Sequence, residues 1–243
     1  MLPESRVETF RKAAQSGSAK HGYKGLPVHA LPGLHEFVAQ ILSNALQPGA
    51  TVLELAAGTG ALSLRLTDSG FKVVACDYVR ENYRLHGKVP FVEVDLNQRF
   101  AGLVPLADAV VAVEIIEHLE NTRHFFREGA SALRDNGILV VTTPNLDNPV
   151  SLAYLIRGGR PLWFSHDDYR AFGHITPVPL WVMQEAAQEA GLRCTRMDSF
   201  GDSGRWVAGW PRMKWFARLI DRVMAGPRHK SEILVAVFQK GPQ

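Results

Sequence analysis

The sequence is poor in cysteine. Its 243 residues contain 2 Cys, too few for the disulfide frameworks that stabilise small secreted domains. Both Cys76 and Cys194 lie in stretches that predict β-strands. We therefore expect two buried thiols, and neither a disulfide nor a metal-binding cysteine pair.

Long apolar runs are absent as well. No stretch approaches the length that a membrane-spanning helix needs, and the N-terminal stretch lacks the apolar core of a signal peptide. We therefore expect a cytoplasmic protein without a transmembrane segment. The chain also has no internal repeat and no low-complexity segment, which excludes a repeat architecture.

Neither sign of charge is in large excess. The chain has 27 Lys and Arg against 24 Asp and Glu, a net charge of +3. This mild basicity tolerates an anionic substrate or a membrane surface without demanding either, and it is too small to favour nucleic acid as a partner. The hydrophobic content of 46% is ordinary for a globular protein, and the length fits one large domain or one domain with an appendage.

The residues that are present are organised around one stretch. Residues 51–55 form a short apolar run with β-branched side chains, which predicts a buried strand. Small residues follow at 56–60, and the apolar residues from Ala61 onward predict a helix. A strand, a glycine turn and a helix form the first half of a βαβ unit, and such a turn brings backbone N–H groups close to a ligand.

Two classes of ligand site use this turn. Dinucleotide sites carry a third glycine, and Ser63 at that position disfavours a nicotinamide oxidoreductase. The pattern Glu54-x-Ala56-x-Gly58-x-Gly60 instead resembles the first motif of the class I S-adenosylmethionine (SAM) methyltransferases, with Ala56 in place of that family's first glycine. The resemblance is to the type 11, 12 and 23 methyltransferases and the ubiquinone-pathway O-methyltransferases. It implies SAM as the cofactor, with an acid near its ammonium and bare backbone near its carboxylate.

Acids recur at the ends of the next three predicted strands, at Asp77, Asp95 and Glu114. Ligands of open α/β sheets bind at the carboxyl ends of the strands. In the resembling family, the first of these acids accepts hydrogen bonds from the ribose and the second holds the adenine amino group. The implied cofactor-binding residues are Glu54, Ala56, Gly58, Gly60, Asp77, Tyr78, Asp95, Leu96 and Glu114.

The pattern of elements predicts an α/β fold, a Rossmann-like, doubly wound sheet of seven strands. We expect a mostly parallel sheet with an antiparallel last strand and insertions after strands five and six. Helices are expected at 34–43, 61–69, 79–86, 121–133, 180–190 and 211–224, and strands at 51–55, 71–76, 89–94, 108–113, 138–143, 192–200 and 231–239.

A single domain is expected over residues 1–243. Within it, 1–45 would form an N-terminal helical lid, with a break at residues 16–18, and 46–145 the SAM-binding half. Residues 146–178 and 201–230 would be substrate-side insertions. Tyr23, His29 and His35 in the lid are either pocket residues or surface residues.

The second motif is Glu114-Ile-Ile-Glu117-His118. It resembles the metal-binding motif of ubiquinone-pathway and small-RNA 2′-O-methyltransferases, where two Glu and a His hold a divalent cation and the RNA enzymes add a later His. His174 is the candidate for that later ligand. The resemblance thus implies a metal site at Glu114, Glu117, His118 and His174, with Mg²⁺ as a candidate cofactor.

A metal-free mechanism stays open. The same motif occurs in methyltransferases without a metal, and His174 or His118 would then take the proton from the acceptor hydroxyl. The candidate catalytic residues are therefore His174, His118 and Glu117. The cluster His166-Asp167-Asp168 is a third candidate, either for reading substrate hydroxyls or for capping a helix.

The expected substrate is a hydroxyl on a sugar or another small molecule. Many N-methylating enzymes carry Asn/Asp-Pro-Pro-Tyr/Phe after the fourth strand, where this chain has Glu114-Ile-Ile-Glu117. Aromatic and polar residues alternate in 146–178, which suits a glycan. The alternatives are an RNA ribose 2′-O-methyltransferase and a non-catalytic SAM-binding protein. Helix 211–224 is expected to pack on the domain or on a second subunit in a homodimer, with a membrane surface as the alternative.

Overall fold

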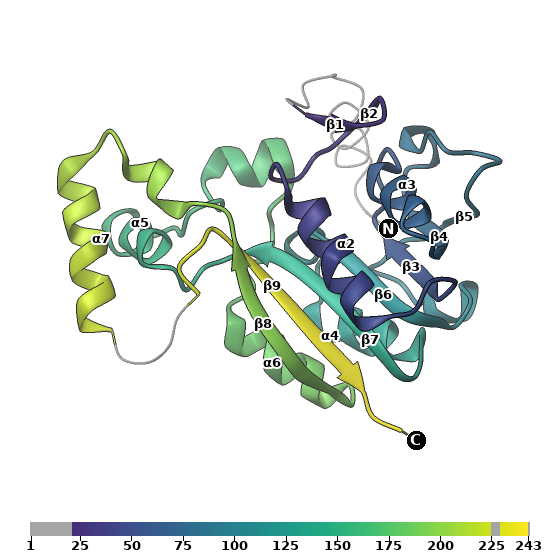
Figure 1. The fold of residues 1–243 in the computed structure, drawn as a ribbon. Coiled ribbons are helices and arrows are strands. Elements are labelled where there is room, and N and C mark those ends of the chain that lie inside the picture. Colours follow the sequence, from purple (N-terminus) through teal and green to yellow (C-terminus); the bar gives the residue numbers. More distant parts are fainter. Residues whose placement is uncertain (1–20, 225–228, 243) are drawn as a thin grey trace.

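The structure is a computed structural model, and it describes residues 21–224 and 229–242. Its centre is a seven-stranded sheet with the order β5-β4-β3-β6-β7-β9-β8 (Figure 1). Only β9 runs antiparallel to the other strands of this sheet. The strands are β3 (Thr51–Leu55), β4 (Lys72–Asp77), β5 (Phe91–Glu93), β6 (Ala107–Val113), β7 (Leu133–Pro144), β8 (Leu192–Phe200) and β9 (Ile233–Lys240). The predicted fold class is confirmed.

Helices cover both faces of the sheet. On one face α2 (Leu34–Ala45) and α3 (Ala61–Asp68) pack against the side chains of Val52 and Val73. On the other face α4 (Thr122–Ser131) and α6 (Leu180–Glu189) pack against Leu53 and its neighbours. Successive residues of a strand point to opposite faces. The continuously apolar strands of the sequence therefore fill two cores, as expected for a sheet buried on both sides.

A third, smaller core lies at one end of the molecule. It joins α5 (Pro149–Gly158), the 3₁₀ turn Ser203–Val207 and α7 (Pro211–Val223), and Figure 1 shows α5 and α7 side by side there. All three elements come from the two segments predicted as insertions. The division into a lid, a cofactor half and substrate-side insertions stays a prediction. None of the described helices is long and apolar enough to cross a membrane.

The helix expected at 79–86 is wrong. The structure has only a 3₁₀ turn at Arg80–Asn82 there. The amide of Val79 donates to Asp77 Oδ1 at 2.8 Å, and the amide of Arg84 donates to the carbonyl of Thr59 at 3.2 Å. These bonds hold the segment against the glycine turn, and Tyr83 is buried on Phe91, with ring centroids 4.7 Å apart. Tertiary contacts therefore replace the helical hydrogen bonds.

Smaller differences concern the ends of elements. Residues 135–137, which lie between the predicted helix 121–133 and the predicted strand 138–143, belong to β7, where Asn136 has a φ of 62° and the pairing with β6 shifts register. A hairpin of β1 (Gly22–Tyr23) and β2 (Leu26–Pro27) was not expected. Cys76 is buried as predicted, whereas Cys194 is only half-buried because β8 is an edge strand. The break expected at 16–18 lies outside the described residues.

Candidate active site

A cavity of about 1330 Å³ opens at the carboxyl ends of the parallel strands. Because β3 and β6 are neighbours in the sheet, the glycine turn after β3 and the motif after β6 meet at this edge. The insertion after β7 adds His174, and the segment before β3 adds His29 and His35. The predicted site residues that line it are Glu54, Ala56, Gly58, Asp77, Tyr78, Asp95, Leu96, Glu114, Glu117, His118 and His174.

Three alternate residues of the glycine turn have a left-handed backbone conformation. Ala56, Gly58 and Gly60 have φ values of 58°, 53° and 88°. A Cβ on Gly58 would meet open space, so glycine is needed there for its backbone. A Cβ on Gly60 would lie 2.9 Å from the Tyr83 ring. Gly60 does not line the cavity. It is the N-cap of α3, and the absence of a side chain lets the start of this helix pack directly on Tyr83.

Glu54 and Ser63 form a buried pair beneath this turn. The Ser63 hydroxyl donates a hydrogen bond to Glu54 Oε2, and both side chains are buried. Burial raises the pKa of Glu54 to about 8, although the hydroxyl opposes this rise. The residue that replaces the third glycine of a dinucleotide site therefore orients an acid at the cavity wall.

Asp77 connects the end of β4 to the turn. One carboxylate oxygen accepts from the amide of Gly58 and the other from the amide of Val79, both at 2.8 Å. Burial raises the pKa of Asp77, and these backbone donors oppose the rise. Asp95 accepts from the amide of Asn97 at 2.9 Å after β5. Both acids thus face the cavity from neighbouring strands.

Glu114 has a strained backbone at the end of β6. Its φ is 51°, a left-handed value that costs a non-glycine residue about 1 kcal/mol or more. Its amide donates to the hydroxyl of Thr142 at 3.0 Å, and that hydroxyl donates to Glu114 Oε1 at 2.8 Å. Burial raises the pKa of Glu114 to about 7. Contacts with β7 hold this strained backbone in place, and the carboxyl group is turned toward Thr142 at the cavity wall.

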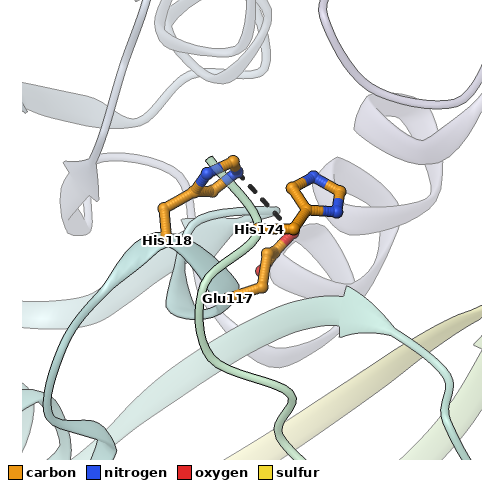
Figure 2. Close-up of side chains that lie close together, drawn as sticks. All are labelled: Glu117, His118 and His174. Carbon is orange, nitrogen blue, oxygen red and sulfur yellow. Dashed lines mark ion pairs between the residues drawn. The ribbon is translucent and has the colours of Figure 1, made fainter. Parts of the chain in front are cut away.

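Glu117, His118 and His174 form the chemical centre of the cavity (Figure 2). Each offers one ligand atom, and these atoms lie within 4.8 Å of one another. Glu117 and His118 belong to the 3₁₀ turn Ile116–His118 after β6, and His174 comes from the insertion after β7. The amides of Ile175 and Thr176 both donate to the Glu117 carbonyl at 3.0 Å, which fixes the insertion on the turn.

Backbone carbonyls orient both imidazoles. His118 Nδ1 lies 3.1 Å from the carbonyl oxygen of Gly173, and His174 Nδ1 lies 2.7 Å from that of Trp163. The rings lie edge to face, with centroids 4.9 Å apart. Burial lowers the pKa of both, to about 3 for His118. Both imidazoles are therefore neutral at pH 7 and offer nitrogen lone pairs.

Glu117 has one oxygen that no described residue satisfies. Its side chain is buried, Oε2 accepts from the Thr143 hydroxyl at 3.0 Å, and Oε1 has no hydrogen-bond partner among the described residues. Oε1 lies 4.0 Å from His118 Nε2, the contact drawn dashed in Figure 2. Burial and the charge of Glu114 raise the pKa of Glu117 well above its ordinary value.

Three of the four predicted metal ligands lie together in the structure, and the metal site stays a prediction. Glu114 is not part of the group whose ligand atoms gather within 4.8 Å, because its carboxyl group is turned toward Thr142. The remaining set fits a divalent cation, since a buried carboxylate oxygen that accepts from none of the described residues lies beside two imidazoles anchored through Nδ1. Two nitrogen donors and one oxygen donor suit a transition metal better than Mg²⁺, which prefers oxygen.

The aromatic side of the cavity combines Trp163, from the segment expected to suit a glycan, with Trp206 and Arg205, which no sequence motif indicated. Trp163 and Trp206 line it with their rings 4.7 Å apart, and Arg205 lies beside them. Arg205 is held by an ion pair of 2.5 Å to the buried Glu232. Trp163 has a φ of 71°, so another strained residue lies in the same cavity. No local motif joins these residues, because three separate segments of the chain supply them.

Two groups of candidates lie outside the cavity. Tyr23 donates to Asp68 at 2.8 Å and covers Arg65, so its role is structural. In the cluster 166–168, Asp168 exchanges hydrogen bonds of 2.8 and 3.1 Å with Ser165. That pattern caps a helical turn, and none of the cluster's side chains lines the cavity.

Known proteins resemble this chain in sequence and in fold. A family model described as a methyltransferase domain matches residues 29–196. A ubiquinone biosynthesis O-methyltransferase of Azorhizobium caulinodans is 30% identical over 183 residues, which are 68% of this chain and 72% of that protein. The protein of that name from Ruegeria sp. is 26% identical over 161 residues, and the alignment covers 63% of this chain and 65% of its length.

A solved structure shows the same fold. The SAM-dependent methyltransferase from Archaeoglobus fulgidus aligns with a TM-score of 0.59 at 16% identity, over 86% of this chain and 96% of that one. This likeness concerns the fold alone. The match of the family model is the stronger finding, because it spans both the glycine turn and the residues of the Glu117 cluster.

Proposed function

Because this chain belongs to the methyltransferase domain family, we propose that it transfers the methyl group of SAM to a hydroxyl oxygen of a small molecule, preferably a sugar. One observation carries the proposal. The Glu117, His118 and His174 group lies in the same cavity as the glycine turn and the strand-end acids. Donor and acceptor can therefore share one enclosed space, and positioning is a large part of catalysis of such a transfer.

The cofactor would occupy the half of the cavity formed by β3, β4 and β5. In this arrangement Glu54 faces the ammonium, the bare backbone at Gly58 faces the carboxylate, and Asp77 accepts from the ribose hydroxyls. Asp95 would hold the adenine amino group. This assignment follows the family resemblance, and its support in the structure is that all four residues line one cavity.

The acceptor would lie between the Glu117 cluster and the aromatic wall. Trp163 and Trp206 offer apolar ring faces, and the guanidinium of Arg205 and the imidazole of His174 offer polar contacts. Aromatic faces combined with a few placed polar groups suit a hydroxylated ring. The names of the ubiquinone biosynthesis O-methyltransferases among the relatives support oxygen as the acceptor atom.

His174 is the better base of the two histidines. With its pKa lowered to about 3, His118 is a weak proton acceptor. His174 donates through Nδ1 to the Trp163 carbonyl, which leaves its other nitrogen, Nε2, with the lone pair that accepts a proton. It would take the proton from the acceptor hydroxyl during transfer. In the alternative mechanism, a divalent cation held by Glu117, His118 and His174 would supply Lewis acidity that lowers the pKa of that hydroxyl. His174 would then be a ligand and not the base.

The two mechanisms are separated by one set of assays. Purified protein is incubated with methyl-labelled SAM and a panel of hydroxylated small molecules, with and without EDTA, and then with added Mn²⁺ or Mg²⁺. With a bound metal, EDTA abolishes transfer, Mn²⁺ restores it better than Mg²⁺, and Glu117→Gln weakens Mn²⁺ binding. Without one, EDTA has no effect and His174→Gln lowers the rate by about a hundredfold or more.

Controls keep this test interpretable. His166→Ala changes a histidine outside the cavity and should leave the rate unchanged. Glu117→Gln should keep the fold, because it removes a buried acid with one oxygen that no residue in the described part of the chain satisfies. Transfer that survives both Glu117→Gln and His174→Gln contradicts the proposed centre. Binding of SAM without transfer to any hydroxylated molecule would favour a non-catalytic SAM-binding protein.

A further inference from the structure

Helix α7 has two apolar faces, and only one of them is used by the fold. Met213, Ala217 and Ile220 are buried against α5 and the turn before α7. On the opposite side Trp215, Leu219 and Val223 are 64%, 38% and 72% exposed. They recur every fourth residue, so they form one ridge along the helix. We call these three residues the α7 ridge. The prediction that α7 packs on the domain is therefore right for one face alone.

Cations lie along the same outer surface of α7. Arg212, Lys214, Arg218 and Arg222 are all exposed, and none of them has an acidic partner among the described residues. Helical spacing places Arg218 and Arg222 beside the ridge, because each lies three residues after Trp215 or Leu219. The single acid of α7, Asp221, is paired with Lys230 at 2.8 Å. The outer surface is therefore both apolar and cationic.

This combination identifies the chemistry of the partner. From it we propose that the α7 ridge binds the surface of an anionic lipid bilayer, with the helix lying in the plane of the headgroups. Trp215, Leu219 and Val223 would enter the boundary between headgroups and acyl chains, while the arginines contact lipid phosphates. The inference goes beyond the proposed methyl transfer and does not depend on it.

A second copy of the chain is a poorer partner for this surface. A two-fold symmetric dimer places the same patch of both subunits face to face. The four cations of α7 would then meet four identical cations with no acid of α7 left to neutralise them. A bilayer that contains phosphatidylglycerol instead supplies one negative charge with each such headgroup. Charge complementarity thus favours the lipid surface.

The position of α7 fits this role. Figure 1 shows α5 and α7 at one end of the molecule, with the sheet on one side of them only. The same appendage carries Arg205 and Trp206, which line the cavity. A bilayer at α7 would therefore contact the same small core that forms part of the cavity wall.

Vesicle sedimentation tests the proposal. The full chain is mixed with vesicles of phosphatidylcholine alone, or of phosphatidylcholine with phosphatidylglycerol, at low and high salt. We expect binding to the anionic vesicles that weakens with salt, and little binding to phosphatidylcholine. The triple variant Trp215→Ser/Leu219→Ser/Val223→Ser and the double variant Arg218→Glu/Arg222→Glu should each lose about tenfold or more in affinity.

The matched control is Trp181→Ser, which removes a tryptophan that is 65% exposed on α6. It should bind vesicles as the unchanged protein does. Melting temperature and SAM affinity, measured on every variant, separate loss of the surface from loss of the fold or the cofactor site. Equal binding to both kinds of vesicle, or unchanged binding by the triple variant, overturns the proposal. A protein that does not bind vesicles, and that forms a dimer in sedimentation velocity which Trp215→Ser abolishes, also overturns the proposal.

Discussion

Single residues carry much of the geometry at the carboxyl edge of the sheet. Ala56, Glu114 and Trp163 line the cavity, and all three are non-glycine residues with positive φ. Strain of this kind persists only where the surroundings enforce it, and it gathers at functional sites. At Ala56 the related family has glycine, so this chain retains a conformation that alanine adopts at a cost.

The first prediction concerns that cost. Ala56→Gly should raise the free energy of unfolding by about 1 kcal/mol, because glycine adopts a φ of 58° without a Cβ clash. Denaturant unfolding measures the change. Ala57→Gly is the matched control, since Ala57 is buried and is not among the residues with positive φ. It should destabilise by roughly 1 kcal/mol, and a loss of stability in both variants would show that Ala56 is unstrained.

The second prediction concerns the proton on Glu54. With a pKa of about 8 the carboxyl group is protonated at pH 7 in the free protein. An ammonium placed beside it favours the carboxylate, so SAM binding at pH 7 should release a proton and strengthen as pH rises toward 8. Calorimetry in buffers of different ionisation enthalpy counts this proton. Glu54→Gln should abolish the release, and an equal proton count in both proteins rules out Glu54 as the ammonium partner.

The protonation of Glu54 should also make the free energy of unfolding depend on pH in a defined direction. The pKa of Glu54 is raised from an ordinary value of 4.5 to about 8 by folding. Between these values the folded state holds more protons than the unfolded state, so its free energy of unfolding falls as pH rises. Glu54→Gln should make that fall shallower in unfolding curves recorded across this pH window.

At the scale of elements, one segment joins the sheet to the insertion after β7. The side chain of Asn145 donates to the carbonyls of His229 and Ser231 at 2.6 and 2.8 Å, which ties the end of β7 to the start of β9. Asn148 is buried, donates to the carbonyl of Asn145 and accepts from the amides of Val150 and Ser151 at the start of α5. These bonds fix the direction in which the insertion leaves the sheet.

The third prediction uses two helix caps with different burial. Asn148→Ala should lower the free energy of unfolding by about 2 kcal/mol or more, because it leaves buried backbone groups without partners. Asn121 caps α4 by accepting from the amide of His124 at 2.9 Å on the exposed surface. Asn121→Ala should therefore lose only about 1 kcal/mol. Equal losses in the two variants would show that the Asn148 network is not rigid.

Local signals predicted most elements, and long-range contacts decided the rest. The buried apolar strands and the helices expected at 121–133 and 180–190 were readable because each is specified by neighbouring residues. The segment at 79–86 was not, since its conformation depends on Thr59 and Phe91. The grouping of Glu117 with His118 follows from adjacency, whereas the contribution of Trp206 depends on two insertions that meet only in the fold.

At the scale of the whole molecule, the sheet order brings the separate motifs to one cavity. The β3–β6 adjacency joins the glycine turn to the Glu117 turn, and the carbonyl of Glu117 holds the insertion that brings His174. The roles of these residues stay predictions. We propose that the half of this cavity bounded by Glu54, Asp77 and Asp95 binds SAM, and the proposed methyl transfer requires this binding.

Titration calorimetry with SAM tests this claim most directly, with NAD as the competing ligand and Asp77→Asn as the variant. We predict micromolar binding of SAM, no comparable binding of NAD, and at least about tenfold weaker SAM binding by Asp77→Asn, with melting curves confirming that the variant is folded. Binding of NAD in place of SAM, or SAM binding that a folded Asp77→Asn variant keeps in full, would contradict the account.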